Sequence, residues 1–563
     1  WRGPCACPPG RSGCASESLR AGRARTRSTA GRCGSTSASS TCTPRRTSSS
    51  RSPPSPSSPA SRSRSPSRTS DEPARLPAMP PAGWARGGGR GPLLALLPLT
   101  ALAGEYYWAQ QKGDVNRTGF SPYKVQSNLN VEPTWVWKDP HLDVIRTTPL
   151  IDGKKNLYLG TQSGRMYKFS PDGAMLWSYR SRRGNTPTVS SIMEGSLYLN
   201  TMYGFVVALD METGEERWAT QISHSTAGDT ACVFALNKTI ISATQQPPGV
   251  GQNNAVVALN DDGTPKWRFE HRFPTFNFQA SSPGDGTIVF QDHSGGLYRL
   301  DLGDGHLIWE SGIAERHESL FTTGAAICGP NGLVYAASNY FGDKGIIHAY
   351  RLSDGKAVWR RDFGMSVNQA VAYGVLAGSD RPAVVAGIGQ NPGFPIVGRL
   401  EGLPLPVWLM DAINEISVWA AGRPTWLWGT KELPARLVAL DAETGQDRWQ
   451  YRPPPFTRPS CEGDESSLKK RLRQAQDTPE FAVDSLCLPD SWAQAIIGGD
   501  GTAYAGHQDG MLYAVRDSDG NGQIEASEVS SHYFGHAFQG SQAIAPGMLA
   551  VAPCGGGLYV WKS

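Results

Sequence analysis

Oxygen-bearing side chains recur at short, regular intervals in one stretch of this 563-residue chain, residues 517–528, which read DSDGNGQIEASE. Its first, third, fifth, ninth and twelfth positions carry side-chain oxygens, and the seventh can add its backbone carbonyl; in chain order these residues are Asp517, Asp519, Asn521, Gln523, Glu525 and Glu528. Calcium takes roughly six to eight hard oxygen ligands. The spacing therefore predicts a Ca2+ site formed by one short segment.

Two further residues fit the same pattern. Gly522 at the sixth position allows a sharp turn, and Ile524 at the eighth can form a short β-contact. The stretch resembles the calcium loop of an EF-hand, which normally lies between two helices. Here the strand-like segment LYAVR leads directly into it, and the sequence shows no second loop of this kind. We therefore expect a structural calcium ion rather than a calcium switch; the alternative is a solvated acidic turn.

An internal repeat must position this loop. Residues 197–218, LYLNTMYGFVVALDMETGEERW, form three strand-like segments joined by Gly-containing turns, and residues 438–449, VALDAETGQDRW, repeat the second half. Related stretches end at Trp177, Trp218, Trp267, Trp309, Trp359 and Trp449. The steps between them are 41 to 50 residues, with one of 90 that is either a single repeat with an insertion or two repeats, one degraded. This period predicts an all-β propeller of four-stranded blades.

The two ends of the repeat region predict how the ring closes. Two further copies occupy residues 500–520 and 548–562, and the second lacks an outermost strand. Residues 133–139, PTWVWKD, resemble that missing strand, with Trp137 in the recurring Trp position. Pairing the two ends would leave no open sheet edge between the first and last blades. We expect eight blades, or seven if one weak repeat is misread.

The consensus LYxGxxxGxLYALDxxTGxxxW over residues 131–562 resembles the pyrroloquinoline-quinone (PQQ)-type propeller repeat, and residues 108–123, WAQQKGDVNRTGFSPY, resemble its lead-in. This resemblance implies either a PQQ-dependent dehydrogenase of alcohols or sugars, or a non-enzymatic scaffold. Such dehydrogenases commonly carry an adjacent Cys-Cys pair, which this sequence lacks, and residues 104–563 contain no familiar catalytic motif. We predict a scaffold that binds a protein or glycan partner as a monomer, with Ca2+ and without PQQ.

The N-terminal region differs in composition from the rest. Residues 1–78 are rich in Arg, Ser and Pro and carry a net charge of +11, which indicates either a leader outside the mature protein or a disordered arm that attracts RNA. Residues 79–103 have the charged, apolar and small-residue regions of a signal peptide, with an apolar run too short to span a bilayer. We expect a secreted or lumenal protein with a lead-in at 104–130 and the propeller at 131–563.

The charge of the predicted mature chain excludes one class of partner. The whole chain carries +4, so removing +11 for residues 1–78 and +2 for residues 79–103 leaves −9 for residues 104–563. A mildly acidic protein lacks the basic charge expected of one that binds nucleic acid.

Two insertions interrupt the repeats, at about 389–433 and 456–489. The first is either an apolar binding loop or a degenerate strand pair. The second is bracketed by Cys461 and Cys487. We predict that these cysteines form a disulfide, because a covalent cross-link stabilises a loop that has little hydrophobic core. Asn116 and Asn237 begin N-glycosylation motifs, which agree with secretion.

Overall fold

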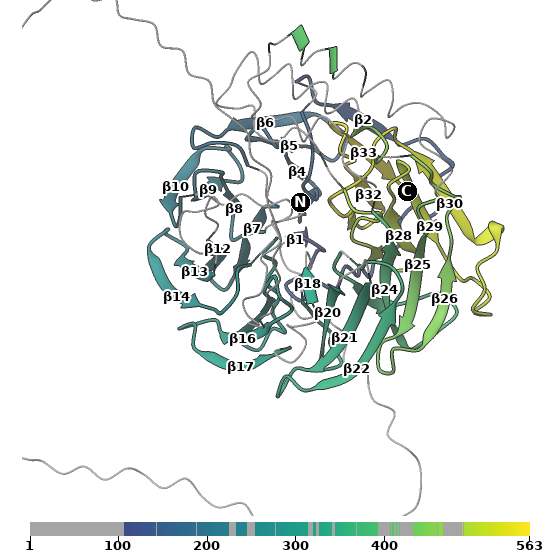
Figure 1. Ribbon diagram of the computed structural model, residues 1–563. Helices are drawn as coiled ribbons and strands as arrows, with labels where there is room; N and C mark the ends of the chain where they lie inside the picture. The colour runs from purple at the N-terminus through teal and green to yellow at the C-terminus, as the bar shows by residue number, and fades with distance from the viewer. Residues whose placement is uncertain are drawn as a thin grey trace, which may run out of the picture. The chain divides into compact units, whose positions relative to one another are not determined.

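The computed structural model describes residues 106–563 except 142, 187–188, 225–231, 245–253, 276, 313–318, 322–325, 341–343, 368, most of 392–431, 459, 465–486 and 488. The described residues belong to one compact unit, Leu94–Ser563. Their strands form eight antiparallel sheets arranged as blades around an axis, which confirms the predicted eight-bladed β-propeller (Figure 1). The predicted leader and signal peptide lie outside the described residues. Within the described part, no helix is both long and apolar enough to cross a membrane.

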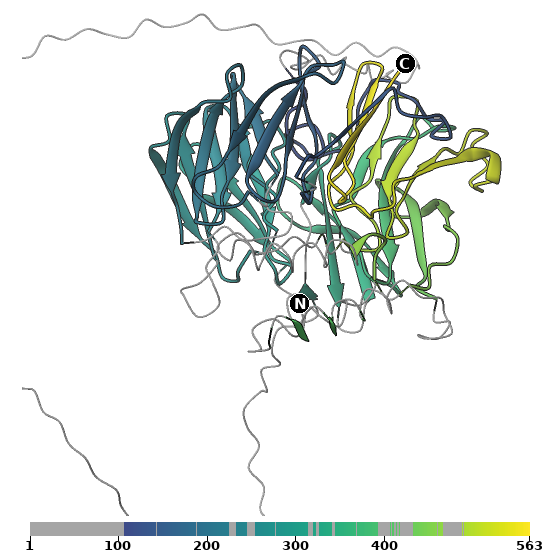
Figure 2. The same cartoon turned by 90° about the horizontal axis from the view of Figure 1, so that it is seen from above.

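The first four blades follow the repeat order of the sequence. They comprise β3 (Leu150–Asp152), β4 (Leu157–Gly160), β5 (Arg165–Phe169) and β6 (Met175–Arg180); β7 (Ser191–Met193), β8 (Ser196–Asn200), β9 (Phe205–Asp210) and β10 (Glu216–Gln221); β11 (Phe234–Leu236), β12 (Thr239–Ala243), β13 (Ala255–Asn260) and β14 (Pro265–Glu270); and β15 (Thr287–Gln291), β16 (Leu297–Asp301) and β17 (Leu307–Ser311). A further strand, β1 (Tyr106–Trp108), pairs with β3. The turned view in Figure 2 shows the blades side by side.

The remaining blades complete the ring. They comprise β18 (Ser319–Phe321), β19 (Ile327–Cys328), β20 (Leu333–Tyr340), β21 (Lys344–Arg351) and β22 (Ala357–Phe363); β23 (Ala372–Val375), β24 (Pro382–Gly389), β25 (Ala435–Asp441) and β26 (Asp447–Tyr451); β27 (Ile496–Ile497), β28 (Ala503–Gly506), β29 (Met511–Val515) and β30 (Val529–Tyr533); and β31 (Ala543–Ala545), β32 (Met548–Val551) and β33 (Gly557–Lys562) with β2 (Trp135–Lys138). Because β24 and β25 are neighbours in one sheet, the long step in the repeat is one blade with an insertion. Most of that insertion, and of the second one, lies outside the described residues.

The burial of a strand's residues depends on the position of the strand in its blade. The five residues of β8 are all buried, because neighbouring blades cover both faces of an inner strand. The outermost strand β6 instead alternates exposed and half-buried residues. The cores of the blades therefore form between adjacent sheets, as propeller geometry requires.

The eighth blade combines strands from both ends of the described chain, as predicted. β2 pairs with β33 in the register Trp135↔Val560 and Lys138↔Gly557. The prediction that Trp137 takes the recurring Trp position is wrong: this register places Trp135 there, and its Nε1 donates to the carbonyl of Pro171 at 3.0 Å. Trp137 instead packs against Tyr167, with ring centroids 4.8 Å apart.

A tryptophan latch joins consecutive blades at six junctions. In each latch, the indole Nε1 of an outermost strand donates to a backbone carbonyl in the turn of the next blade; the pairs are Trp135–Pro171, Trp177–Met211, Trp218–Asp261, Trp267–Leu302, Trp309–Leu352 and Trp359–Ala442. The ring also lies on a turn glycine. A Cβ on Gly214, at φ +75°, would lie 2.7 Å from the indole of Trp177, so the Asp-x-x-Thr-Gly turn needs glycine for contact as well as for conformation.

The lead-in runs along the axis and hydrogen-bonds to several blades. The carbonyls of Ala109, Val115, Thr118 and Gly119 accept backbone N–H groups at 2.7 to 2.8 Å; the donors are Ile192, Ser282, Tyr373 and Ile497, respectively. These donors come from the second, fourth, sixth and seventh blades or their inner connections. The chain's own backbone therefore occupies this part of the axis.

The predicted disulfide is also corrected. Cys487 is bonded to Cys554, with a Cα–Cα distance of 5.8 Å, and not to Cys461. The thiol of Cys461 is buried and donates to the carbonyl of Pro489 at 3.4 Å. Cys554 follows β32, so the bond ties the second insertion to the closing blade. Of the two glycosylation motifs, Asn237 is exposed in the turn between β11 and β12, whereas Asn116 is half-buried beside the axis.

Candidate calcium site on the seventh blade

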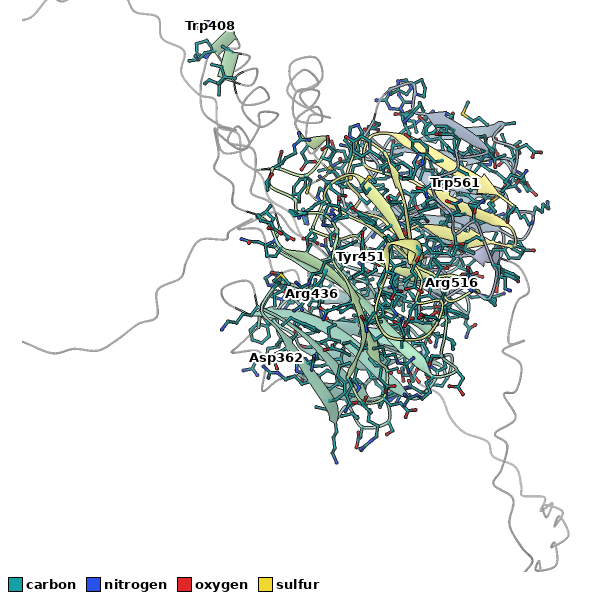
Figure 3. The ribbon with its side chains drawn as sticks, turned by 90° about the vertical axis from the view of Figure 1, so that its right-hand side faces the viewer. Asp362, Trp408, Arg436, Tyr451, Arg516 and Trp561 are labelled. Atoms are coloured by element: carbon teal, nitrogen blue, oxygen red, sulfur yellow. A yellow bond between two sulfur atoms is a disulfide. The ribbon has the colours of Figure 1, made fainter. Side chains whose placement is uncertain are left out.

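The predicted calcium loop, residues 517–528, connects β29 to β30. In Figure 1 it lies at the outer rim of the ring beside β30, and Figure 3 labels Arg516, the residue that precedes it. Pairing of Val515 with Val529 and a 3.0 Å hydrogen bond from the Arg516 N–H to the Glu528 carbonyl close the neck of the loop. The loop replaces the short turn at the equivalent place in the other blades, and it ends in a 3-10 helix, η4 (Ala526–Glu528).

Three of the predicted ligands come together. Asp517, Asp519 and Glu528 each present a carboxylate oxygen, and these oxygens lie within 4.8 Å of one another. Asp517 is 6 % exposed, and its Oδ2 accepts the Gly522 N–H at 3.1 Å. Its Oδ1 is buried and accepts no hydrogen bond. A buried carboxylate oxygen without a partner costs free energy, and a cation at this cluster would satisfy it.

The other predicted ligands lie around this cluster. The Asn521 side-chain nitrogen donates to Asp519 at 2.7 Å and to Glu525 at 3.3 Å, while its oxygen accepts the Gln523 N–H at 2.6 Å. The Asn521 amide thus bridges two carboxylates, and its side chain must rotate before its oxygen can bind a cation. Glu525 and Gln523 are exposed.

Backbone donors hold Glu528 in its ionised form. Burial alone would raise the pKa of its carboxyl, but the N–H groups of Ser518 and Glu525 donate to it and hold the pKa below its usual value. Glu528 is therefore a carboxylate at neutral pH. Because the set contains only carboxylate, amide and carbonyl oxygens, it suits a hard cation such as Ca2+ rather than a thiol- or imidazole-seeking metal.

Two residues outside the loop, which the sequence analysis missed, form the surface that the loop contacts. Gly378 lies in the β23–β24 turn of the sixth blade, and a Cβ added to it would lie 2.5 Å from the Cα of Gly520. A Cβ on Gly522 would lie 2.8 Å from the carbonyl of Arg448. The sequence signal was indirect: the loop lies where the second and sixth blades have an Asp-x-x-Thr-Gly turn, and this turn contacts the preceding blade.

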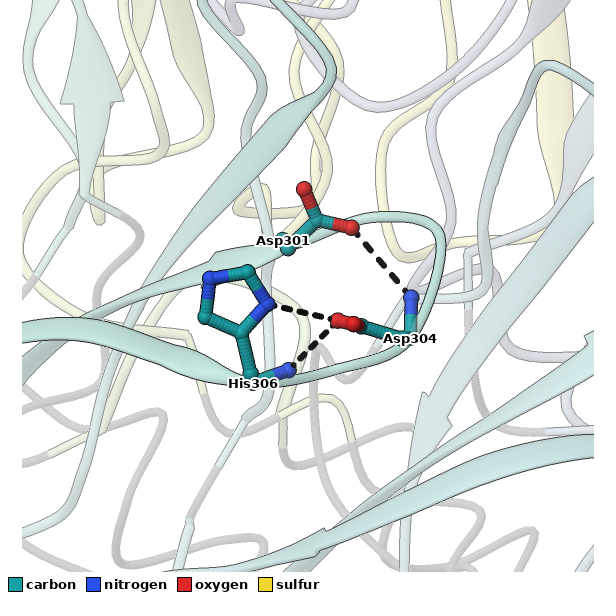
Figure 4. Close-up of side chains that lie close together, drawn as sticks. All are labelled: Asp301, Asp304 and His306. Carbon is teal, nitrogen blue, oxygen red and sulfur yellow. Dashed lines mark hydrogen bonds and ion pairs between the residues drawn. The ribbon is translucent and has the colours of Figure 1, made fainter.

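A second group of possible metal ligands, Asp301, Asp304 and His306, lies on the turn after β16 (Figure 4). Asp301 accepts the Gly303 N–H at 2.7 Å, and Asp304 accepts the backbone N–H and the ring Nδ1 of His306 at 3.0 and 2.7 Å. The hydrogen bonds of a tight turn account for this arrangement. It contains no buried oxygen without a partner comparable to Asp517 Oδ1.

The lead-in residues on the axis do not fit a PQQ site. A tricarboxylate quinone needs cations that are available for binding, but burial lowers the pKa of Lys112 well below its usual value, and its Nζ donates to the carbonyls of Val371 and Ala495 at 2.5 and 3.1 Å. The buried Arg117 likewise donates to the carbonyls of Ala280 and Gln111. Both cations stabilise inner strand connections, and the sequence has no adjacent cysteines to cover a cofactor.

Comparison with known proteins agrees with the repeat. A family profile of PQQ-type repeats, described as outer membrane protein assembly factor BamB, matches residues 162–386. BamB of Moranella endobia is 24 % identical over 37 % of this chain and 67 % of its own length; BamB of Burkholderia pseudomallei is 23 % identical over 47 % and 71 %.

Among solved structures, a europium-containing methanol dehydrogenase superimposes with a TM-score of 0.54 at 11 % identity, covering 81 % of this chain and 98 % of that one. At this identity the likeness shows the fold alone. The calcium loop lies outside the residues that the family profile matches. The described strands form an eight-bladed β-propeller, and its residues 162–386 match the PQQ-type repeat family.

Proposed function

We propose that this protein is a calcium-binding β-propeller that acts as a non-enzymatic binding scaffold, secreted or retained in the lumen of the secretory pathway. One observation carries the calcium assignment: three carboxylates converge at the rim, and the buried Oδ1 of Asp517 accepts no hydrogen bond. The spacing of residues 517–528 supplies the remaining oxygens from the same segment.

The scaffold role is favoured over a PQQ-dependent dehydrogenase. The relatives matched in sequence are named assembly factors, whereas likeness to a dehydrogenase concerns the fold alone. The two lead-in cations are bonded to backbone carbonyls, so they are not free to bind a quinone. A propeller rim presents many loops on a rigid ring, which suits recognition of a protein or glycan partner. Secretion rests on the signal-like residues 79–103 and on the glycosylation motif at the exposed Asn237.

Native mass spectrometry of the purified full chain tests this function. After exposure to calcium and PQQ, we expect one calcium ion per chain and no retained quinone. Asp517→Ala with Glu528→Ala should abolish calcium binding, whereas Asp301→Ala with Asp304→Ala, which removes the carboxylates of the group on the turn after β16, should leave it unchanged. A stoichiometric quinone adduct would overturn the scaffold assignment, and an unchanged calcium stoichiometry in the first variant would overturn the site.

A further inference from the structure

The junction between the sixth and seventh blades lacks the tryptophan latch found at six other junctions. Trp449 occupies the latch position, since it pairs with Ala439 as Trp359 pairs with Ala349. Its side chain is buried, at 4 % exposure, yet its Nε1 donates no hydrogen bond. The seventh blade carries the loop 517–528 at the place where the first six blades carry the turn that supplies the acceptor.

The loop's backbone makes the contact instead. Gly520 and Gly378, both at φ +71°, approach so closely that a Cβ on Gly520 would lie 2.9 Å from the Gly378 carbonyl. The surface beneath the loop is fixed by Arg448, whose guanidinium donates to the carbonyls of Arg381 and Pro382 at 2.7 and 2.9 Å and bonds to Asp441. The sixth blade therefore offers a rigid platform, and the position of the loop on it depends on the shape of the loop.

That shape depends in turn on the charge of the cluster. Three carboxylates within 4.8 Å repel one another, and a bound cation both removes the repulsion and draws the ends of the loop together. A groove of about 770 Å3 lies beside the loop, lined by Tyr451 and Pro453 of the sixth blade and by Ile524, Glu525 and Val529 of the seventh. Figure 3 labels Tyr451 on this side of the ring. Side chains therefore do not fill the space between the sixth and seventh blades at this point, and the contact of the loop with Gly378 is what joins the two blades here.

We infer that bound calcium latches the seventh blade to the sixth, in place of the tryptophan hydrogen bond that this junction lacks. This inference rests on the proposed calcium binding. It makes calcium a regulator of one specific interface of the ring: occupancy holds residues 517–528 against Gly378, and removal releases the two blades from each other at the rim.

Hydrogen exchange of the full chain, with calcium and with a chelator, tests the inference. We expect the chelator to cause loss of protection in the β23–β24 turn (residues 376–381) and in β26 as well as in the loop. The corresponding elements of the first and second blades, β6 and the turn at Gly214, should exchange alike in both conditions. A change confined to residues 517–528 would overturn the inference.

Two glycine substitutions, Gly378→Ala and Gly332→Ala, test the contact between the blades independently of calcium binding. Gly378→Ala, at φ +71°, adds a Cβ against the loop, whereas Gly332→Ala, at φ +76°, adds one with nothing within 4 Å, so both place alanine at positive φ and only the first contacts the loop. We expect both variants to bind one calcium by native mass spectrometry, and only Gly378→Ala to lose the calcium-dependent protection of the sixth blade. If the unaltered chain binds no calcium, the proposed function fails. If calcium binds and Gly378→Ala retains that protection, the latch fails.

Discussion

Lys168 of the first blade and Glu212 of the second form an ion pair at 2.8 Å in which the lysine side chain is buried and the glutamate is exposed. The same Nζ donates to the Met211 carbonyl, which also accepts the latch bond from Trp177. A second lysine, Lys154, bonds to Glu212 at 2.7 Å. This junction therefore combines an apolar contact, a neutral hydrogen bond and an ion pair. The junction between the sixth and seventh blades lacks the corresponding tryptophan hydrogen bond.

The Glu212 pair predicts a pH-dependent contribution to stability. Hydrogen bonds from Lys154, then Lys168, lower the pKa of Glu212 to about 2. A lowered folded-state pKa means that the stabilisation is present above the unfolded pKa of about 4.3 and is lost as the pH falls toward 2. Glu212→Gln should therefore lower Tm at pH 7, with the difference from the unaltered chain shrinking between about pH 4.5 and 2. Glu215→Gln, three residues further along the chain, is the control; an equal effect of both variants would contradict the prediction.

Two tryptophans test the latch hydrogen bond. Trp267→Phe removes the Nε1 that donates to Leu302 at 2.9 Å, whereas Trp449→Phe removes an Nε1 that donates to nothing. We expect the first change to cost about 1 kcal/mol more than the second, the usual net value of one hydrogen bond. Urea or thermal unfolding of the two variants measures the difference. Equal losses would mean that ring packing alone holds the blades.

Calcium should raise thermal stability through the loop. At a concentration about 100 times Kd, a ligand that binds only the folded state stabilises it by about 2.7 kcal/mol. Asp517→Asn preserves the size of the side chain and should make Tm insensitive to a chelator. Asp304→Asn, on the turn after β16, should retain the chelator response of the unaltered chain, and differential scanning calorimetry compares the three. A chelator response that survives in Asp517→Asn would place the ion elsewhere.

The Cys487–Cys554 bond closes 67 residues of chain. Replacing both cysteines with serine should lower stability by about 2–4 kcal/mol, because the cross-link restricts the unfolded chain. Peptide mapping without reduction should recover the Cys487 peptide joined to that of Cys554. A recovered peptide joining Cys461 to Cys487 would instead support the pairing suggested by sequence spacing.

The regular spacing of the latch tryptophans is what made the fold predictable. Each repeat is one blade, and the orphan strand at 133–139 could fill only the position left open beside β33. The choice between Trp135 and Trp137 could not be made in the same way, because the two residues lie on one face of the strand and only the register with Val560 distinguishes them.

The loop ligands were also readable, since all of them lie within twelve consecutive positions. The contact between Gly520 of the loop and Gly378 could not be predicted from the sequence, because the two glycines belong to different blades and neither has a side chain that suggests a partner. The cysteine pairing failed for a related reason: Cys554 lies in the eighth blade, beyond the whole seventh blade in sequence, and closeness in sequence favoured Cys461.

Closure of the ring by β2 and β33 has a consequence for biogenesis. These partners are more than 400 residues apart, so the pairing joins the most distant parts of the propeller and carries a high loop-closure cost. On the ribosome, β2 emerges early and must wait for β33, with an unsatisfied sheet edge in the meantime. Two nascent chains close together could exchange these strands and form an intertwined dimer. Cells that make this protein in quantity should therefore need chaperones that keep the open ring apart from its copies.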